Sequence, residues 1–318
     1  MREIPLRAVE DAARAIYDPV IRTPIVPLRG AGPAGSQIFL KLETLQPIGS
    51  FKIRGAQNVV RQIPRSDLKD GVWTVSAGNA AQGVALAARV AGVPCSVMVM
   101  DTAPATKLRA IEALGASIIP VSYDECWRTV ETHRSDRMRG LFIHPFDDDR
   151  FIAGNGTAGL EILEDVPDVD AVVAPMGGGG LLAGVASAIQ AKKPGVKIFA
   201  AEPETAAPLN ASFRNGDASV FEGWTKSFVD GAGGRSVLPT MWPLLSRLVT
   251  ASIVVTLDEV ARAIKIVAER SHVIAEGAAG CAVAAALSGR VPGNKIVVIV
   301  SGGNIDLSLF ASLVADNR

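Results

Sequence analysis

The sequence has no excess of charge of either sign, because 32 lysine and arginine residues balance 32 aspartate and glutamate residues. A surface that binds nucleic acid or an anionic membrane usually carries a basic surplus. Neither partner is therefore expected. The first residues, MREIP, also lack the apolar segment of a secretion signal, so we expect a soluble protein of the cytoplasm.

Cysteine and histidine are scarce, with three residues of each. The cysteines are widely spaced and form no CxxC pair, which argues against a disulfide framework. We expect buried thiols in a reducing compartment. The histidines show no spacing typical of a metal site, so we expect structural roles and no metal. These residues are Cys95, Cys126, Cys281, His133, His144 and His272.

Hydrophobic runs long enough to cross a membrane are also missing. Residues 171–191 carry no charge, but Pro175 and four successive glycines interrupt them, and a lipid-facing helix tolerates such a break poorly. What the sequence does contain is 48% hydrophobic residues in a chain of 318. That is enough to bury a large core, divided between two lobes.

Short β-branched runs alternate with helical patterns from about residue 37 onward. The runs are continuous, which is typical of strands buried on both faces of a parallel sheet. The sequence therefore predicts a doubly wound α/β architecture. Strands are expected at 37–42, 72–75, 95–100, 117–121, 141–143, 170–174, 196–201, 252–256 and 295–300. Helices are expected at 51–62, 79–91, 104–114, 123–139, 151–164, 180–192, 258–270, 277–287 and 305–315.

The strands fall into two groups, one within residues 72–143 and one in the remainder. We expect a large domain formed by 1–64 and 148–318, with a small mobile domain, 65–147, inserted into it. Residues 203–250 are less regular and richer in Pro, Gly and Trp. We expect them to wrap the larger lobe or help close the cleft.

Four glycines, Gly177–Gly180, stand between a predicted strand and an apolar helix. The N–H groups at a helix start and the helix dipole both favour an anion, and glycine lets the backbone curl around it. The turn has neither the lysine of a P-loop nor a clean GxGxxG spacing. A plain tight turn needs only one or two glycines, so four in a row favour a phosphate site.

Two further loops follow predicted strands. Ser76–Gly83 opens the helix 79–91, where free N–H groups could hold a carboxylate; the alternative is that Asn79 only caps this helix. Ser301 begins the loop S-G-G-N after strand 295–300. Open α/β sheets bind ligands at this end of their strands.

Lys52 lies between apolar neighbours in G-S-F-K-I-R-G. If Ser50 is the N-cap, Lys52 falls in the first turn of a helix, where positive charge is unfavourable. Desolvation acts in the same direction, so the pKa of the amine should fall and a neutral amine could form an imine with an aldehyde. The alternative is a lysine that reaches solvent. Combined with a phosphate site, the imine interpretation indicates pyridoxal phosphate.

Four motifs carry a resemblance over nearly the whole chain: S-F-K-I-R-G-A (50–56), S-A-G-N-A-A-Q-G (76–83), G-G-G-G-L (177–181) and S-G-G-N (301–304). Together they resemble the pyridoxal-phosphate enzymes of fold type II, and within these the serine/threonine dehydratase and serine racemase group. The resemblance implies a tryptophan synthase β-like α/β fold, with the cofactor between two doubly wound parallel-sheet lobes. It also implies a homodimer.

The resemblance assigns roles by position. Lys52 would hold the cofactor covalently and act as the base at the substrate Cα. The implied cofactor-binding residues are Phe51, Lys52, Asn79, Gly177, Gly178, Gly179, Gly180, Leu181 and Ser301, with Asn79 on O3′ and Ser301 on the pyridine nitrogen. The implied substrate-binding residues are Ser76, Ala77, Gly78, Asn79 and Gln82, with Phe146 as a candidate wall of the side-chain pocket.

The implied reaction is β-elimination from a β-hydroxy-L-amino acid, such as serine, threonine or a bulkier analogue, to give a 2-oxo acid and ammonia. Ser301 is too weak an acid to protonate the pyridine fully, so the cofactor is a moderate electron sink and prompt loss of a β-group is favoured. Alternatives are a racemase, a β-replacement enzyme, or a phosphate- or nucleotide-sensing α/β protein without catalysis.

Three positions depart from the family pattern. Ala77 stands where racemases of the group place a second serine, which argues against racemisation. Ala80 replaces the usual histidine, so either a bulkier substrate is accepted or a neighbouring side chain fills the space. Glu202 matches a cation ligand of some members, but Pro208 replaces the next one, and we expect no metal. The chain is expected to lack the regulatory domain of biosynthetic threonine dehydratases.

Overall fold

The computed structural model describes residues 2–315, and its strands form two separate sheets. The larger sheet has the order β1-β2-β10-β7-β8-β9. All its neighbouring strands are parallel except β1, which pairs antiparallel with β2. Its strands are β1 (Ile25–Pro27), β2 (Gln37–Leu42), β7 (Ala171–Pro175), β8 (Lys197–Pro203), β9 (Ala251–Val255) and β10 (Lys295–Val300).

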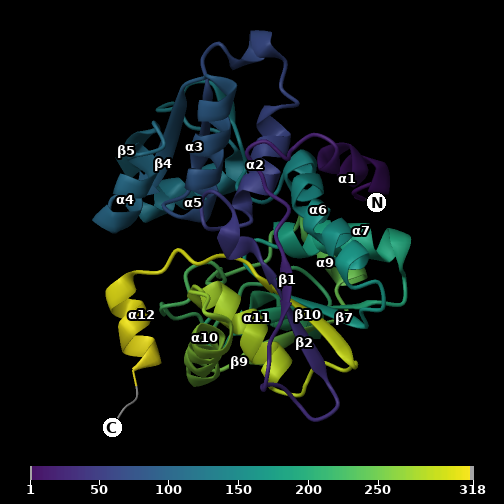
Figure 1. Ribbon diagram of the computed structural model, residues 1–318. Coiled ribbons are helices and arrows are strands. Elements are labelled where there is room, and N and C mark those ends of the chain that lie inside the picture. The colour runs from purple at the N-terminus through teal and green to yellow at the C-terminus, as the bar shows by residue number, and fades with distance from the viewer. Residues whose placement is uncertain (1, 316–318) are drawn as a thin grey trace.

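The smaller sheet has four parallel strands in the order β5-β4-β3-β6. Figure 1 shows this lobe above the larger one, with its helices packed beside it. The two-lobed α/β architecture expected from the sequence is confirmed. The strands are β3 (Val72–Val75), β4 (Cys95–Met100), β5 (Ser117–Val121) and β6 (Leu141–Phe142), and the helices are α3 (Asn79–Ala91), α4 (Ala105–Glu112) and α5 (Tyr123–Thr132).

Helices cover both faces of the larger sheet. Because successive side chains of a strand point to opposite faces, Val172 of β7 joins one core cluster and Val173 joins the other. The first face is covered by α1 (Leu6–Ala13), α6 (Asp149–Asp165), α7 (Gly180–Lys192) and α9 (Trp242–Leu248), and the second by α10 (Leu257–Ser271), α11 (Gly277–Leu287) and α12 (Leu307–Val314). A short helix, α8 (Pro208–Asn215), follows β8.

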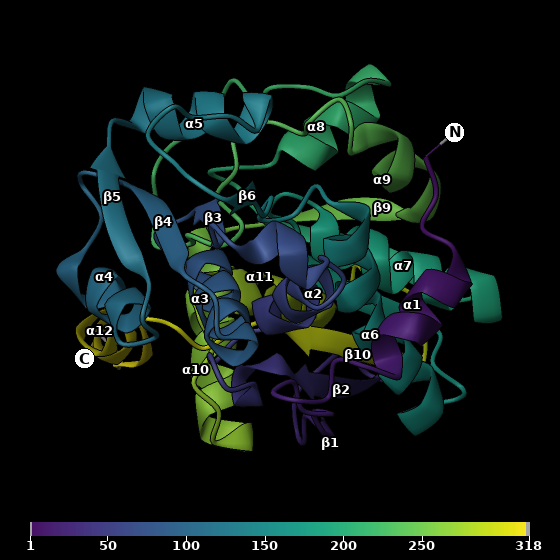
Figure 2. The same ribbon diagram turned by 90° about the horizontal axis from the view of Figure 1, so that it is seen from above.

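Helix α2 (Lys52–Val60) lies between the two lobes (Figure 2). Two glycines let the neighbouring helices α6 and α3 approach α2 closely, one on each side. A Cβ on Gly55 would lie 2.3 Å from the Phe151 ring of α6, and a Cβ on Gly83 of α3 would lie 3.0 Å from the Lys52 carbonyl oxygen. Lys52 is the first residue of this helix, so it stands at the junction of the lobes.

Several local predictions were wrong. Helices α1, α8 and α9, strand β1 and the 3-10 turns Glu43–Leu45 and Arg65–Leu68 were not expected. The helix predicted over 123–139 ends at Thr132, because His133 has a left-handed φ of 59°. Phe51, rather than Ser50, is the cap residue of α2, and the Ser50 hydroxyl lies 3.4 Å from the Lys52 amide.

The three cysteines are free and buried, as expected. Among residues 2–315, no helix is both long enough and apolar enough to pass through a bilayer.

Candidate functional site

The Lys52 amine points into the junction between the lobes. Its Nζ donates a hydrogen bond of 2.6 Å to the Pro145 carbonyl oxygen and lies 5.3 Å from the Phe51 ring centroid. Burial lowers the pKa of Lys52 to about 8, although the nearby Glu276 carboxylate opposes this shift. A substantial neutral fraction is therefore available near physiological pH, which a nucleophilic amine requires.

The glycine turn packs against Phe146, the residue that follows Pro145, the hydrogen-bond partner of Lys52. A Cβ on Gly178 would fall 2.2 Å from the Phe146 ring, and one on Gly180 would fall 2.7 Å from the Phe146 carbonyl oxygen. Gly179 has a left-handed φ of 88°. Because α7 begins at Gly180, the N–H groups of its first turn, including that of Leu181, have no helical acceptor. Close packing against Phe146 and Leu245 leaves no room for side chains in the turn, while the first N–H groups of α7 remain without helical acceptors.

Ser301 follows β10 and is 1% exposed. Its carbonyl oxygen accepts a 3.0 Å hydrogen bond from the Phe51 amide, which ties this strand end to the residue before Lys52. Within residues 2–315 its hydroxyl has no hydrogen-bond partner. A hydroxyl in this state remains available to a ring nitrogen.

The loop after β3 brings the third motif to the same place. The Ser76 hydroxyl accepts from the Gly78 amide at 3.1 Å, and α3 starts at Asn79 with Gly78 as its cap residue. Asn79 therefore does not cap the helix, so the alternative interpretation of this residue was wrong. Ala77 and Gln82 are both partly buried, and the Gln82 side chain makes no hydrogen bond within the described residues.

Asn79 is instead held by two residues that sequence reasoning missed. Its Nδ2 donates to both Glu276 carboxylate oxygens, at 2.9 and 3.0 Å, and its Oδ1 accepts from Asn304 Nδ2 at 2.7 Å. Burial raises the pKa of Glu276 to about 7. Glu276 precedes α11 in A-E-G-A-A-G, and an acidic residue beside an all-apolar helix is the signal that could have revealed it.

Two places in the fold carry candidate metal ligands, and the first is Glu202. Both Glu202 oxygens already accept hydrogen bonds, from the Leu209 amide and the Asn210 amide at 2.8 Å each, and one also accepts from Ser252. Burial raises the pKa of Glu202 to about 7, so this carboxylate acts as an internal cap of α8. The arrangement does not fit a divalent cation, which needs several free oxygens.

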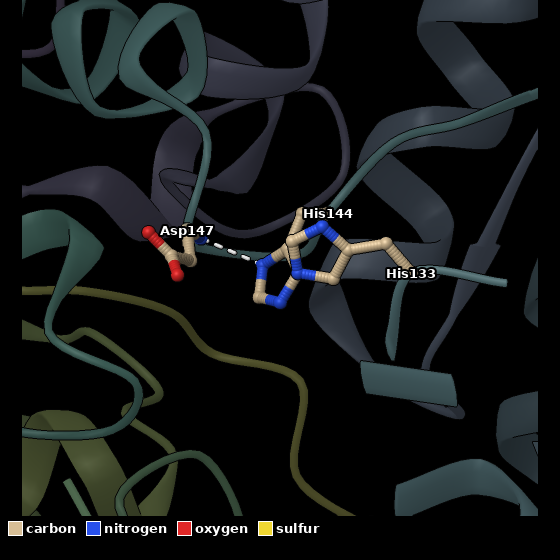
Figure 3. A group of neighbouring side chains, drawn as sticks. All are labelled: His133, His144 and Asp147. Atoms are coloured by element: carbon tan, nitrogen blue, oxygen red, sulfur yellow. Dashed lines mark hydrogen bonds between the residues drawn. The ribbon is translucent and has the colours of Figure 1, made fainter. Parts of the chain in front are cut away.

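The second place is the group His133, His144 and Asp147, whose nearest ligand atoms lie within 4.8 Å of one another (Figure 3). Both nitrogens of His144 already have partners, since Nδ1 accepts from the Asp147 amide at 2.7 Å and Nε2 lies 3.2 Å from the Val130 carbonyl oxygen. The Asp147 carboxylate is bonded by Arg2 and Thr240. We therefore assign no metal to this group.

The predicted motifs thus converge, although they are far apart in the sequence. Lys52 contacts the carbonyl before Phe146, whose ring borders Gly178, while Asn79 reaches Glu276 and Asn304. The partly buried amine, the side-chain-free turn and the free Ser301 hydroxyl fit an aldehyde cofactor with a phosphate and a ring nitrogen. Phe146 lies beside the glycine turn, as a pocket wall requires, and Ala80 is buried.

Comparison with known proteins identifies the family of the chain. Residues 16–302 match the family model described as "Pyridoxal-phosphate dependent enzyme". An L-threonine ammonia-lyase of Thermotoga maritima is 38% identical over 315 residues, covering 98% of this chain and 78% of the relative. Human serine racemase is 38% identical over 310 residues, covering 94% and 91%. The structure of maize serine racemase is similar with a TM-score of 0.88, at 33% identity, covering 98% and 97%.

Proposed function

The chain belongs to the family of pyridoxal-phosphate dependent enzymes, and from this premise we propose that it is an ammonia-lyase. It removes the hydroxyl group and the amino group of a β-hydroxy-L-amino acid, serine, threonine or a bulkier analogue, and releases a 2-oxo acid and ammonia. The observation that carries the proposal is the partly buried Lys52 amine, which is bonded to the Pro145 carbonyl oxygen, while the next residue, Phe146, packs against the glycine turn. The relatives named L-threonine ammonia-lyase support it.

The chemistry divides between the cofactor and the chain. When bound, pyridoxal phosphate supplies an aldehyde and an electron sink. Lys52 would hold the cofactor and would serve as the base for the substrate Cα proton, which its lowered pKa allows near neutral pH. The glycine turn, Gly177–Gly180, with the Leu181 amide would hold the phosphate, and Phe51 would pack against the ring. The Ser301 hydroxyl would donate a hydrogen bond to the ring nitrogen, which leaves the ring without a full positive charge.

The substrate is held by the loop of the smaller lobe. We propose that the N–H groups of residues 76–79 bind its carboxylate, with Gln82 at the edge of this site. Asn79 orients O3′ of the cofactor, and Glu276 and Asn304 fix the Asn79 amide in turn. The larger lobe would thus supply most of the cofactor contacts, and the smaller lobe would supply the substrate contacts and Asn79.

Racemisation is the second candidate, because human serine racemase is as similar as the threonine ammonia-lyase. A racemase must return a proton to the face of Cα opposite Lys52. Ala77 has no hydroxyl for this task and instead packs against the core of the smaller lobe. We therefore expect elimination to exceed racemisation by about a hundredfold or more, the lower end of what a positioned proton donor contributes.

The preferred substrate size depends on Ala80 and Phe146. We propose that the small Ala80 leaves room for a bulky β-substituent against Phe146. The kinetics of the wild type and Ala80→His on L-threonine and on an aryl-substituted β-hydroxy amino acid test this idea. A lower kcat/KM for the aryl substrate alone is expected, and an unchanged preference would refute it.

Further proposals concern the organisation and setting of the protein. We propose that residues 65–147 form a small mobile domain and that 1–64 and 148–318 form the cofactor domain. A homodimer in the cytoplasm, without a nucleic-acid or membrane partner, is proposed from the resemblance and from the balanced charge. Light scattering tests the dimer.

The activity is tested with purified protein supplied with pyridoxal phosphate. Release of 2-oxo acid and ammonia from L-serine and L-threonine is measured beside formation of the D-enantiomers. We expect equal amounts of 2-oxo acid and ammonia, and a loss of about 10³-fold or more in Lys52→Ala. D-amino acid without 2-oxo acid would favour the racemase, and a colourless protein that binds only nucleotides would favour a sensor.

A further inference from the structure

The hydrogen bond that orients Lys52 depends on a turn at the end of the smaller lobe. Its acceptor is the carbonyl oxygen of Pro145, 2.6 Å from Nζ. Proline has no N–H group, so Pro145 cannot be anchored through its own amide. The position of this carbonyl must therefore be set by the residues on either side.

His144 supplies that anchor through one ring nitrogen. Its Nδ1 accepts hydrogen bonds from the Asp147 amide at 2.7 Å, drawn dashed in Figure 3, and from the Phe146 amide at 3.2 Å. These two bonds fold the chain back over residues 144–147 and enclose Pro145. Because Nδ1 accepts twice, it carries no proton, and Nε2–H is the donor to the Val130 carbonyl oxygen, 3.2 Å away.

The surroundings keep this ring neutral. His144 is 3% exposed and packs edge-on against the Phe146 ring, with centroids 4.6 Å apart. Burial lowers its pKa to about 4; the Asp147 carboxylate opposes the shift, whereas His133 and Lys52 add to it. The imidazole therefore remains an acceptor at every pH at which the protein is expected to work.

We infer that His144 is a positioning residue for Lys52, acting through the Phe146 and Asp147 amides and the Pro145 carbonyl. A neutral amine has two N–H bonds and one lone pair. With one N–H held by Pro145, rotation about the Cε–Nζ bond is restricted and the lone pair is confined to fewer directions, which favours attack on a carbonyl carbon. The same turn carries Phe146 against Gly178, so His144 fixes the amine and the glycine turn together.

This inference rests on the proposed function, and two amide variants test it, each of which reproduces one ring-nitrogen position. In His144→Asn, Oδ1 can accept at the place of Nδ1. In His144→Gln, the amide can donate at the place of Nε2, but no acceptor remains for the Phe146 and Asp147 amides. The readout is the rate at which the cofactor-free chain links to added pyridoxal phosphate, followed by its visible absorbance and by borohydride trapping, beside kcat, KM and Tm.

The expected result is asymmetric. His144→Asn should link the cofactor within about threefold of the wild-type rate, whereas His144→Gln should be slower by at least about tenfold and lose mainly kcat. Equal rates in both variants, fast or slow, would overturn the inference, as would a slow Asn variant beside a fast Gln variant. A wild-type protein that never links the cofactor would refute the proposed function instead.

A second measurement uses the wild type, so it tests the inference even if neither variant folds. NMR of the wild type labelled with ¹⁵N-histidine should show His144 as the neutral Nε2–H tautomer from pH 6 to 8, with an unprotonated Nδ1. The opposite tautomer, or a cation in this range, would contradict the anchoring bonds and overturn the inference.

Discussion

Helices α7 and α11 of the larger lobe and helices α4 and α5 of the smaller lobe differ in how completely they are buried. In the larger lobe α7 buries ten of its 13 residues and α11 ten of its 11. In the smaller lobe α4 buries only Ile111, and α5 buries three of its ten residues. Few buried contacts make local movement inexpensive. The glycine turn therefore leads into a well-packed helix, α7, whereas the 76–83 loop leads into α3, which buries eight of its 13 residues in a lobe whose other two helices are lightly packed.

Helix α2 belongs to both lobes but is held differently by each. Toward the larger lobe, Arg54 donates to both oxygens of Glu43 and both oxygens of Glu161, all at 2.7 to 2.9 Å, and all three side chains are at most 1% exposed. Toward the smaller lobe, Ile53, Ala56 and Val60 make only apolar contacts. Directional bonds therefore fix the backbone of α2 to the larger lobe, whereas Lys52 reaches the smaller lobe through one hydrogen bond, to the Pro145 carbonyl oxygen.

The first prediction breaks this directional anchor and has the largest expected effect. Arg54→Met leaves Glu43 and Glu161 buried without their main partner, and should lower the free energy of unfolding by about 3–5 kcal/mol. The control is Arg22→Met, which removes an exposed pair with Glu164 and Asp165 and should cost less than about 1 kcal/mol. Urea unfolding measures both, and equal effects would contradict the difference between the two attachments.

The second prediction concerns Glu276, which joins Asn79 of the smaller lobe to the larger lobe. Its pKa is raised to about 7, so its contribution to stability is present below pH 4.5 and is lost as the pH rises through 7. Glu276→Gln should remove this loss, which is at most about 3 kcal/mol.

Thermal unfolding between pH 4.5 and 8 measures the effect of Glu276→Gln. The variant should show a shallower fall in stability than the wild type across this range. It should also lower the pKa of Lys52 below about 8, because the carboxylate is the charge that opposes the shift. Parallel pH profiles of the two proteins would show that Glu276 is not the group that titrates.

The third prediction tests the glycine turn of the densely packed lobe. A Cβ at Gly178 would meet the Phe146 ring at 2.2 Å, so Gly178→Ala should weaken pyridoxal-phosphate binding by about a hundredfold, or about 2.7 kcal/mol. Gly195→Ala is the matched control, because nothing lies within 4 Å of its Cβ. Equilibrium dialysis measures both affinities, and an unchanged affinity in Gly178→Ala would remove the turn from the phosphate site.

The fourth prediction has the smallest effect and probes movement between the lobes. Lys107 of α4 forms an ion pair with Asp230. The next residue, Gly231, lies beside Gly177 of the glycine turn. Lys107→Gln should raise KM about two- to threefold, the size expected of an exposed pair. Lys295→Gln breaks a similar pair with Asp168 inside the larger lobe and should leave KM unchanged. Equal changes in the two variants would argue against a lobe-closing role.

The sequence predicted the buried strands well, because continuous β-branched runs of this length are typical of strands covered on both faces. β2, β3, β4, β5 and β10 have the expected bounds. Helices α8 and α9 were hidden in the Pro- and Trp-rich segment, since short helices held by tertiary packing carry little periodic signal. The site motifs were found from their glycines and Lys52.

The links between the motifs could not be predicted. Asn79 and Glu276 are 197 residues apart, and no local pattern pairs them. His144 gave no metal spacing, and its role became visible only when its ring was seen to accept the amides that surround Pro145. Which side chains meet across the fold depends on how all the elements pack together, and no local stretch of sequence determines that.

The central claim is that Lys52 is the residue that carries the cofactor. The most direct test is to treat the protein with pyridoxal phosphate, reduce it with borohydride and map the modified lysine by peptide mass spectrometry. We predict one pyridoxyl group per chain on Lys52, and none in Lys52→Ala. Modification of a different lysine, or retention of the group in Lys52→Ala, would contradict the account.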